Sequence, residues 1–230
     1  MENDNFLPNE RRDFLAKVAT GAAAMGLSML ASSMPVAAAE RSIHSASDAD
    51  EWFKKVKGAH KIVFDVTEPH ETFPFAWPRV FLLTNKATGT DESNCGVVVI
   101  LRHNGIPYTM EDRLWDKYKF GEVFKVTDPK TKAPSVRNPF WQPQPGDYKV
   151  PGVGNVAIGI NELQASGVMF CVCDVALTVY SAVLAQGMNM DAADVKKDFV
   201  AGILPGIQIV PSGVWAVGRA QEQGCAYCYV

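Results

Sequence analysis

The sequence predicts an α/β protein, a three-layer α/β/α sandwich with a mainly parallel sheet. The runs 95–102 and 168–173 are almost entirely apolar, which is the pattern of strands covered on both faces. Strand-like and helix-like segments alternate along most of the chain, as they do when helices connect parallel strands. The composition, 47% hydrophobic and 20% charged residues, is typical of a globular domain.

The first half of the domain contains two expected strands and two expected helices. A short β-branched run at 61–66 predicts the first strand, and the apolar run described above predicts the second. Between them a helix is expected over 77–85, because Pro78 suits the first helical position and Gly89 follows soon after the last. A second helix is expected over 110–118.

The second half alternates in the same way. Its expected elements are a short helix from 161 that ends near 167, a strand at 168–173, helices at 175–190 and 194–201, a strand at 207–210, a helix at 214–223 and a terminal strand at 225–230. The helix at 175–190 has no charged residue. This indicates a helix that is buried on most sides, under a neighbouring layer or a second subunit.

A long irregular segment, 126–154, interrupts this pattern and is called the arm below. Its six prolines make regular structure improbable. The arm contains the aromatic residues Phe140, Trp141 and Tyr148, which would be costly to leave in water. They predict packing against a ligand, with Trp141 as a binding residue, or against another subunit. Together with the uncharged helix, the arm predicts a homo-oligomer. The alternative is that the arm folds back across this helix and covers it, which would give a monomer.

The first 39 residues resemble a twin-arginine export signal. The adjacent Arg11 and Arg12 are followed by Phe14 and Leu15, and an uncharged, mildly apolar stretch then ends in small residues at Ala39 before Glu40. Cleavage between Ala39 and Glu40 would leave one domain, 40–230, in the periplasm and without a stable membrane span. The alternative is a retained membrane anchor, since 22 uncharged residues are long enough to cross a bilayer.

Charge and cysteine content exclude or weaken several classes of function. The net charge of −3 gives no basic excess for binding nucleic acid. Cys225 and Cys228 have the spacing of a redox or metal pair, but in a strand their sulfur atoms would point to opposite faces. Cys95 begins a strand, far from the expected site, and indicates packing. No metal site and no cofactor are therefore expected.

Ligands of parallel sheets bind beyond the carboxyl ends of the strands. In this chain the expected ends are followed by His103 and Asn104, by Cys173, and by Ser212 and Gly213. Cys173 precedes a helix, whose N-terminal N–H groups favour the reactive thiolate, although a buried core cysteine is the alternative. His103 could act as an acid or base, or as a structural hydrogen-bonding group. We expect Asn104, Ser212 and Gly213 to contribute to binding.

The segments 167–173, 204–214 and 221–227 resemble the C-terminal half of DsrE/DsrF-like proteins. The resemblance extends over 61–230 and departs from the family at the arm. It implies the α/β/α fold and small oligomers, and it places Cys173 where members with sulfur-transfer activity carry a persulfide. The implied function is a sulfur carrier or sulfurtransferase that exchanges sulfur with a donor or acceptor protein. The alternative is a non-catalytic oligomeric binding module that uses the arm.

Overall fold

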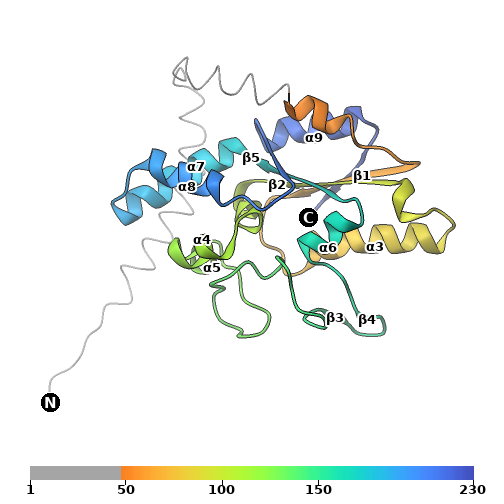
Figure 1. Ribbon diagram of the computed structural model, residues 1–230, viewed down its shortest axis with the longest axis horizontal. Coiled ribbons are helices and arrows are strands. Elements are labelled where there is room, and N and C mark those ends of the chain that lie inside the picture. Colours follow the sequence, from red (N-terminus) through yellow and green to blue (C-terminus); the bar gives the residue numbers. More distant parts are fainter. Residues whose placement is uncertain (1–47) are drawn as a thin grey trace.

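The computed structural model describes residues 48–230, which form an α/β/α sandwich around a five-stranded parallel sheet (Figure 1). The strands follow the order β6-β5-β2-β1-β7, and every neighbouring pair is parallel. They are β1 (His60–Val66), β2 (Cys95–Leu101), β5 (Met169–Cys173), β6 (Ile207–Val210) and β7 (Ala226–Tyr229). The fold class is thus confirmed, and each strand lies within one residue of its predicted bounds.

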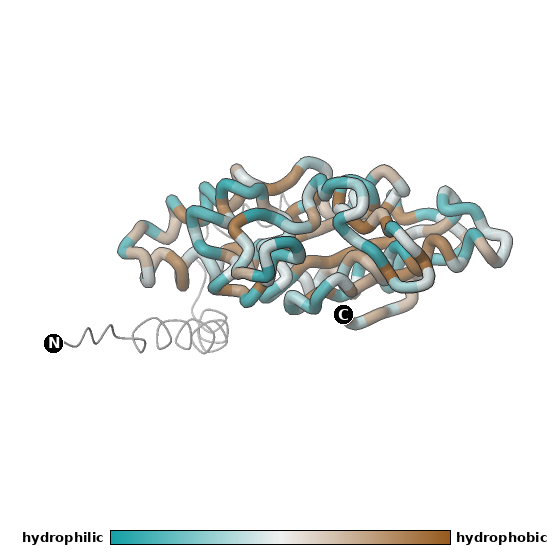
Figure 2. The backbone as a smooth tube through the Cα atoms, turned by 90° about the horizontal axis from the view of Figure 1, so that it is seen from below, coloured by the Kyte–Doolittle hydropathy of each residue, from teal (hydrophilic) through white to brown (hydrophobic). Residues whose placement is uncertain are grey.

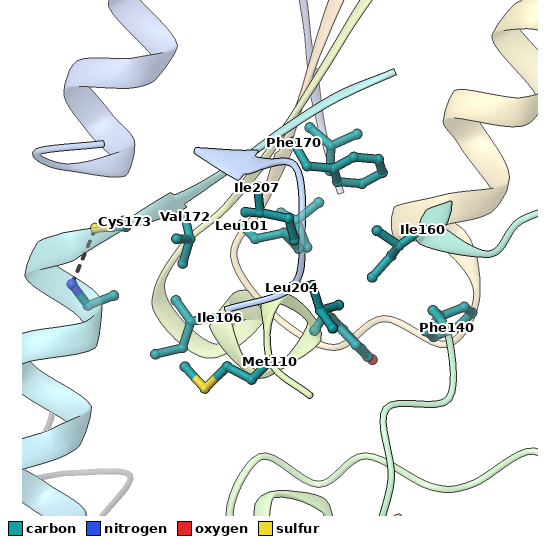
Figure 3. Close-up of a cluster of buried hydrophobic side chains, with 14 of the residues drawn as sticks. Leu101, Ile106, Met110, Phe140, Ile160, Phe170, Val172, Cys173, Leu204 and Ile207 are labelled. Atoms are coloured by element: carbon teal, nitrogen blue, oxygen red, sulfur yellow. Dashed lines mark hydrogen bonds between the residues drawn. The ribbon is translucent and has the colours of Figure 1, made fainter. Parts of the chain in front are cut away.

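The sheet separates two hydrophobic clusters because its side chains alternate between faces. Phe64, Val99 and Leu101 belong to the larger cluster, whereas Val98 and Ile100 belong to the smaller one. All seven residues of β2 are buried, which explains why its sequence is apolar without alternation. Figure 2 shows the hydrophobic strand segments in the middle of the molecule and mostly hydrophilic segments outside, and Figure 3 shows part of the larger cluster.

Helices cover both faces of the sheet (Figure 1). The helices α3 (Phe73–Ala87) and α6 (Ile160–Ala165) lie on one face, and α9 (Gly213–Glu222) lies on the other with a short helix at 48–53. The predicted start of α3 is wrong by four residues. Pro74, not Pro78, occupies the first turn, and Pro78 lies inside the helix.

Further helices lie at the carboxyl side of the sheet. They are η2 (His103–Thr109), α4 (Asp112–Lys117), α5 (Phe120–Val123), α7 (Asp174–Met188) and α8 (Ala192–Ala201), while η1 (Glu92–Asn94) precedes β2. The helix α7, which has no charged residue after Asp174, packs on α8 and η2. Phe124 also covers it, with its ring centroid 4.9 Å from that of Tyr180. Val179 and Val183 are buried. Much of α7 is therefore covered within one chain.

The arm folds onto its own domain. Its short strands β3 (Lys149–Val150) and β4 (Gly154–Asn155) form a hairpin. Phe140 stacks on Phe75 of α3 with centroids 4.2 Å apart, and Tyr148 stacks on Phe140 at 5.1 Å. Phe140 and Tyr148 are both buried. The expectation that these two side chains face another subunit is wrong, because the domain core covers them. The homo-oligomer stays a prediction.

The proposed export signal lies outside the described residues. This applies to Arg11, Arg12, Phe14 and Leu15 and to the cleavage position at Ala39 and Glu40. Between residues 48 and 230, no helix has the length and hydrophobicity needed to cross a membrane. Cleavage and periplasmic location stay predictions.

Candidate functional site

The carboxyl ends of the central strands lie at one level. Val66, Leu101 and Val172 are aligned across β1, β2 and β5, so the residues that follow these strands emerge at the same edge of the sheet. Five residues gather there, and we refer to them as the Cys173 site. They are Asp65, Arg102, Cys173, Gly213 and Tyr227.

Cys173 is the last residue of β5 and the N-cap of α7. Its Sγ accepts a hydrogen bond from the backbone N–H of Ala176 at 3.3 Å, marked by the dashed line in Figure 3. The backbone N–H groups of Val175 and Gly213 also favour the charged form of the sulfur. The first turns of α7 and α9 therefore both direct N–H groups toward this sulfur, as helix N-termini do toward anions.

Burial and these N–H groups have opposite effects on the pKa of the Cys173 thiol. Only 7% of Cys173 is exposed. Loss of water raises the pKa of the Cys173 thiol above its usual range, the three N–H groups lower it in part, and the charge of Asp174 raises it again. Asp174 forms an ion pair with Lys196 at 2.9 Å. The free cysteine is therefore a protonated thiol near neutral pH, in surroundings that can stabilise an anion.

Arg102 provides a positive charge beside the sulfur. Its Nε and Nη2 donate to the carboxylate of Asp65 at 2.6 and 2.9 Å, and the hydroxyl of Tyr227 donates to the same carboxylate at 2.8 Å. Asp65 is 1% exposed, and the two hydrogen bonds from Arg102 hold the ion pair in one geometry at this buried position. Negative charge on Asp65, and to a smaller extent on Cys173, raises the pKa of Arg102. Arg102 is therefore close enough to Cys173 to interact with a negative charge on its sulfur atom.

His103 and Asn104 take part in a different contact. His103 has a left-handed backbone, with φ of 50°, and its Nδ1 lies 3.4 Å from the hydroxyl of Tyr180. Tyr180 donates its hydroxyl to Oδ1 of Asn104. Loss of water lowers the pKa of His103, the charge of Arg102 lowers it further, and Glu68 opposes both. Within residues 48–230, no hydrogen bond joins His103 or Asn104 to Cys173.

The remaining predicted binding residues also differ in position. Ser212 caps α9, where its Oγ accepts the N–H of Trp215 at 3.2 Å. Gly213 lies against the Arg102 side chain. Ser212 and Gly213, although adjacent in sequence, therefore have separate roles. Trp141 is half-buried in the arm, and its backbone N–H donates to the carbonyl of Asn138 at 3.3 Å. Among the described residues, no hydrogen bond connects Trp141 with the Cys173 site.

The other cysteines are dispersed. Cys225 belongs to the smaller hydrophobic cluster and Cys228 packs on the larger one, so their side chains lie on opposite faces of the sheet. This is the arrangement that their spacing predicts. All five cysteines are free thiols, and Cys95 and Cys171 are buried. Residues 48–230 contain no group of three or more potential metal ligands.

Sequence reasoning missed the polar partners of the site, Asp65, Arg102 and Tyr227. One signal was present. Asp65 interrupts the apolar run 62–66, and a carboxylate in such a position needs a cation or several hydrogen-bond donors. Arg102, directly after the neighbouring strand, is that cation.

No protein-family model matches the chain, and no curated protein matches it. The chain is similar to a solved structure of a protein of unknown function from Methanobacterium thermoautotrophicum, with 20% sequence identity and a TM-score of 0.33. The match covers 74% of this chain and 99% of the other chain.

Proposed function

We propose that this protein is a sulfur carrier of the DsrE/DsrF-like type, which holds a persulfide on Cys173 and acts in the periplasm after twin-arginine export. One observation supports the proposal best. N–H groups from the first turns of two helices, together with the Arg102 guanidinium, favour negative charge at the Cys173 sulfur.

The proposed step transfers one sulfur atom. The Cys173 sulfur attacks the outer sulfur of a donor persulfide or polysulfide. The S–S bond of the donor breaks, a new S–S bond forms at Cys173, and the donor leaves as a thiol with the proton that Cys173 gives up. One S–S bond replaces another, so the transfer needs no external oxidant or reductant. The outer sulfur of the new persulfide is the atom that the acceptor removes.

Mass spectrometry of the intact protein tests this proposal. After incubation with inorganic polysulfide, a small donor suited to a largely buried cysteine, the protein should gain the mass of one sulfur atom, and a thiol reductant should remove it. Cys173→Ser should abolish the gain. Cys228→Ser is the matched control, because Cys228 is more exposed than Cys173 and would react first if loading were unspecific.

Two results would contradict the sulfur-carrier proposal. One is a wild-type protein that gains no sulfur, and the other is a gain that persists in Cys173→Ser but disappears in Cys228→Ser. The acid or base role of His103 stays a prediction, and His103→Gln tests it in the same assay. Unchanged loading rates in this variant would leave His103 with its contact to Tyr180 alone.

The alternative, a non-catalytic oligomeric binding module that uses the arm, also stays a prediction. The buried Phe140 and Tyr148 cannot themselves form an exposed docking surface. They do line a cavity, so binding by the arm would place a ligand between the arm and the domain. Ligand-induced thermal stabilisation that persists in Cys173→Ser would favour this function.

A further inference from the structure

A cavity of about 380 Å³ lies between the arm and the loop that connects β1 with α3. Lys125 and arm residues between 126 and 148 form part of its lining, and the loop contributes residues between 69 and 72. The volume is within the range of small-molecule sites. The cavity follows the carboxyl end of β1, where parallel sheets bind ligands.

Aromatic rings line one side of the cavity. Phe140 and Tyr148 stack almost parallel, with an angle of 8° and centroids 5.1 Å apart. Tyr108 packs edge-on against Phe140 at 5.4 Å. These rings are fixed within the core, since Phe140 also stacks on Phe75. A rigid aromatic wall of this kind suits a flat apolar group.

Tyr108 supplies a free hydroxyl at the cavity wall. Its side chain is 1% exposed and lines the cavity, yet its hydroxyl has no hydrogen-bond partner among the described residues. Burial raises the pKa of Tyr108, so the hydroxyl stays protonated and can donate. By contrast, the hydroxyl of Tyr148 already donates to the carbonyl of Pro139 at 2.6 Å. The Tyr108 hydroxyl is therefore available to donate a hydrogen bond to an acceptor that enters the cavity.

Positive charge dominates the rim. Lys125 and Lys132 line the cavity, both are exposed, and neither forms an ion pair within residues 48–230. Asp128 faces the same space, but Arg137 neutralises it at 2.8 Å. Glu71 is the opposing charge on the rim. Two lysines against one unpaired glutamate favour a ligand with a negative charge.

We propose that this cavity binds a small organic anion with a flat apolar body. The apolar body would lie along the Phe140 and Tyr148 rings, and its anionic group would accept a hydrogen bond from Tyr108 beneath Lys125 and Lys132. This inference deepens the binding-module alternative and does not depend on sulfur chemistry at Cys173.

Calorimetric titration with two probes of equal shape tests the assignment. The carboxylate 2-naphthoate should bind one per chain, at least tenfold more tightly than the neutral 2-naphthamide. Raising NaCl from about 50 to 500 mM should weaken the binding of 2-naphthoate but not that of 2-naphthamide, because salt screens the interaction between charges. Cys173→Ser should bind 2-naphthoate like the wild type, which separates this result from that of the sulfur-loading assay.

Variants assign the binding to the cavity. Tyr108→Phe keeps the ring and removes the hydroxyl donor, so it should lower the affinity for 2-naphthoate about fivefold or more. Exchanging both Lys125→Gln and Lys132→Gln should reduce the preference for the carboxylate to below threefold. Lys149→Gln is the matched control, since Lys149 is an exposed lysine of the same arm that does not line the cavity.

Three results would overturn the proposal. They are the absence of saturable 2-naphthoate binding, equal affinity for the two probes, and variants at Tyr108, Lys125 and Lys132 that bind like Lys149→Gln. Thermal unfolding of each variant shows whether it is folded, and the conservative Tyr108→Phe exchange keeps the test valid if a lysine variant is unstable.

Discussion

Arg102 and Asp65 form a two-point ion pair at the carboxyl end of the sheet, with Nε–Oδ1 and Nη2–Oδ2 distances of 2.6 and 2.9 Å. They are separated in sequence but adjacent in space, because β1 and β2 pair in parallel with Asp65 beside Ile100. Asp65 is buried, whereas the Arg102 side chain is 26% exposed. The pair therefore connects the core of the sheet to the surface beside Cys173.

Arg102→Met should destabilise the protein more than the loss of a surface ion pair would. It leaves the Asp65 carboxylate buried with only the Tyr227 hydroxyl as a partner, so we expect a loss of about 2–4 kcal/mol in the free energy of unfolding. Tyr227→Phe removes one hydrogen bond and should cost about 1 kcal/mol. Urea denaturation measures both values.

The control for this prediction is Lys197→Met. Lys197 is exposed and has no ion pair within the described part of the chain, so the change should stay within about 0.5 kcal/mol. An Arg102→Met protein as stable as this control would show that the pair contributes nothing to folding.

Gly213 is needed where the Arg102 side chain crosses the start of α9. A Cβ at position 213 would lie 2.4 Å from Cδ and 2.6 Å from Cβ of Arg102, and the bond to Asp65 prevents Arg102 from moving easily. Gly213→Ala should therefore cost about 1–3 kcal/mol in stability. It should also slow sulfur loading of Cys173, because the N–H of residue 213 and the guanidinium would both shift.

Gly218→Ala is the matched control for that variant. Gly218 lies in the same helix, and a Cβ there meets no atom within 4 Å. Alanine favours the helical state, so this change should stabilise the protein by up to about 1 kcal/mol. Equal stabilities of the two alanine variants in urea would argue against the contact with Arg102.

The strands could be predicted from sequence because burial on both faces removes polar residues from them, as in β2. The start of α3 could not, because two prolines in one helix each suit a first turn, and tertiary packing of Phe75 selects the earlier one. Cys173 was predictable since a strand end and a helix start coincide there. Its partners were not, because Tyr227 reaches Asp65 only after the last strand pairs with the first.

The reactivity of Cys173 should increase with pH over an unusually high range. Burial raises the pKa of its thiol, so alkylation by iodoacetamide should be slow at pH 7 and still accelerating near pH 9. Asp174→Asn removes a charge that raises this pKa, and it should accelerate alkylation at pH 8. Peptide mass spectrometry assigns the modified cysteine.

Asp194→Asn provides the comparison for Asp174→Asn. Asp194 is an exposed carboxylate of α8, and its removal should leave the alkylation rate unchanged. A wild-type rate that reaches its plateau below pH 7 would contradict a raised pKa. So would a slower reaction of Asp174→Asn.

Asp198 should make the stability of the protein sensitive to acid. It joins α8 to the region of α4, accepting hydrogen bonds from Lys117 at 2.6 Å and Tyr118 at 2.8 Å and pairing with Arg113. Partial burial raises the pKa of Asp198, but these hydrogen bonds outweigh it and lower the pKa to about 2. An unfolded aspartate titrates near pH ~3.9. The carboxylate therefore stabilises the folded state fully above about pH 5, and this contribution is lost as the pH falls through 4 toward 2.

Asp198→Asn should consequently lose about 1–2 kcal/mol relative to the wild type at pH 6, a value reduced from the full pKa shift because solvent screens the partly exposed partners. The difference should shrink by at least half at pH 2.5, where the unfolded aspartate is already protonated. Asp194→Asn, on the exposed side of the same helix, should show a small difference of about 0.5 kcal/mol or less. Urea denaturation of the three proteins at both pH values measures these differences. A difference for Asp198→Asn that is constant with pH would mean that its hydrogen bonds do not favour the charged form.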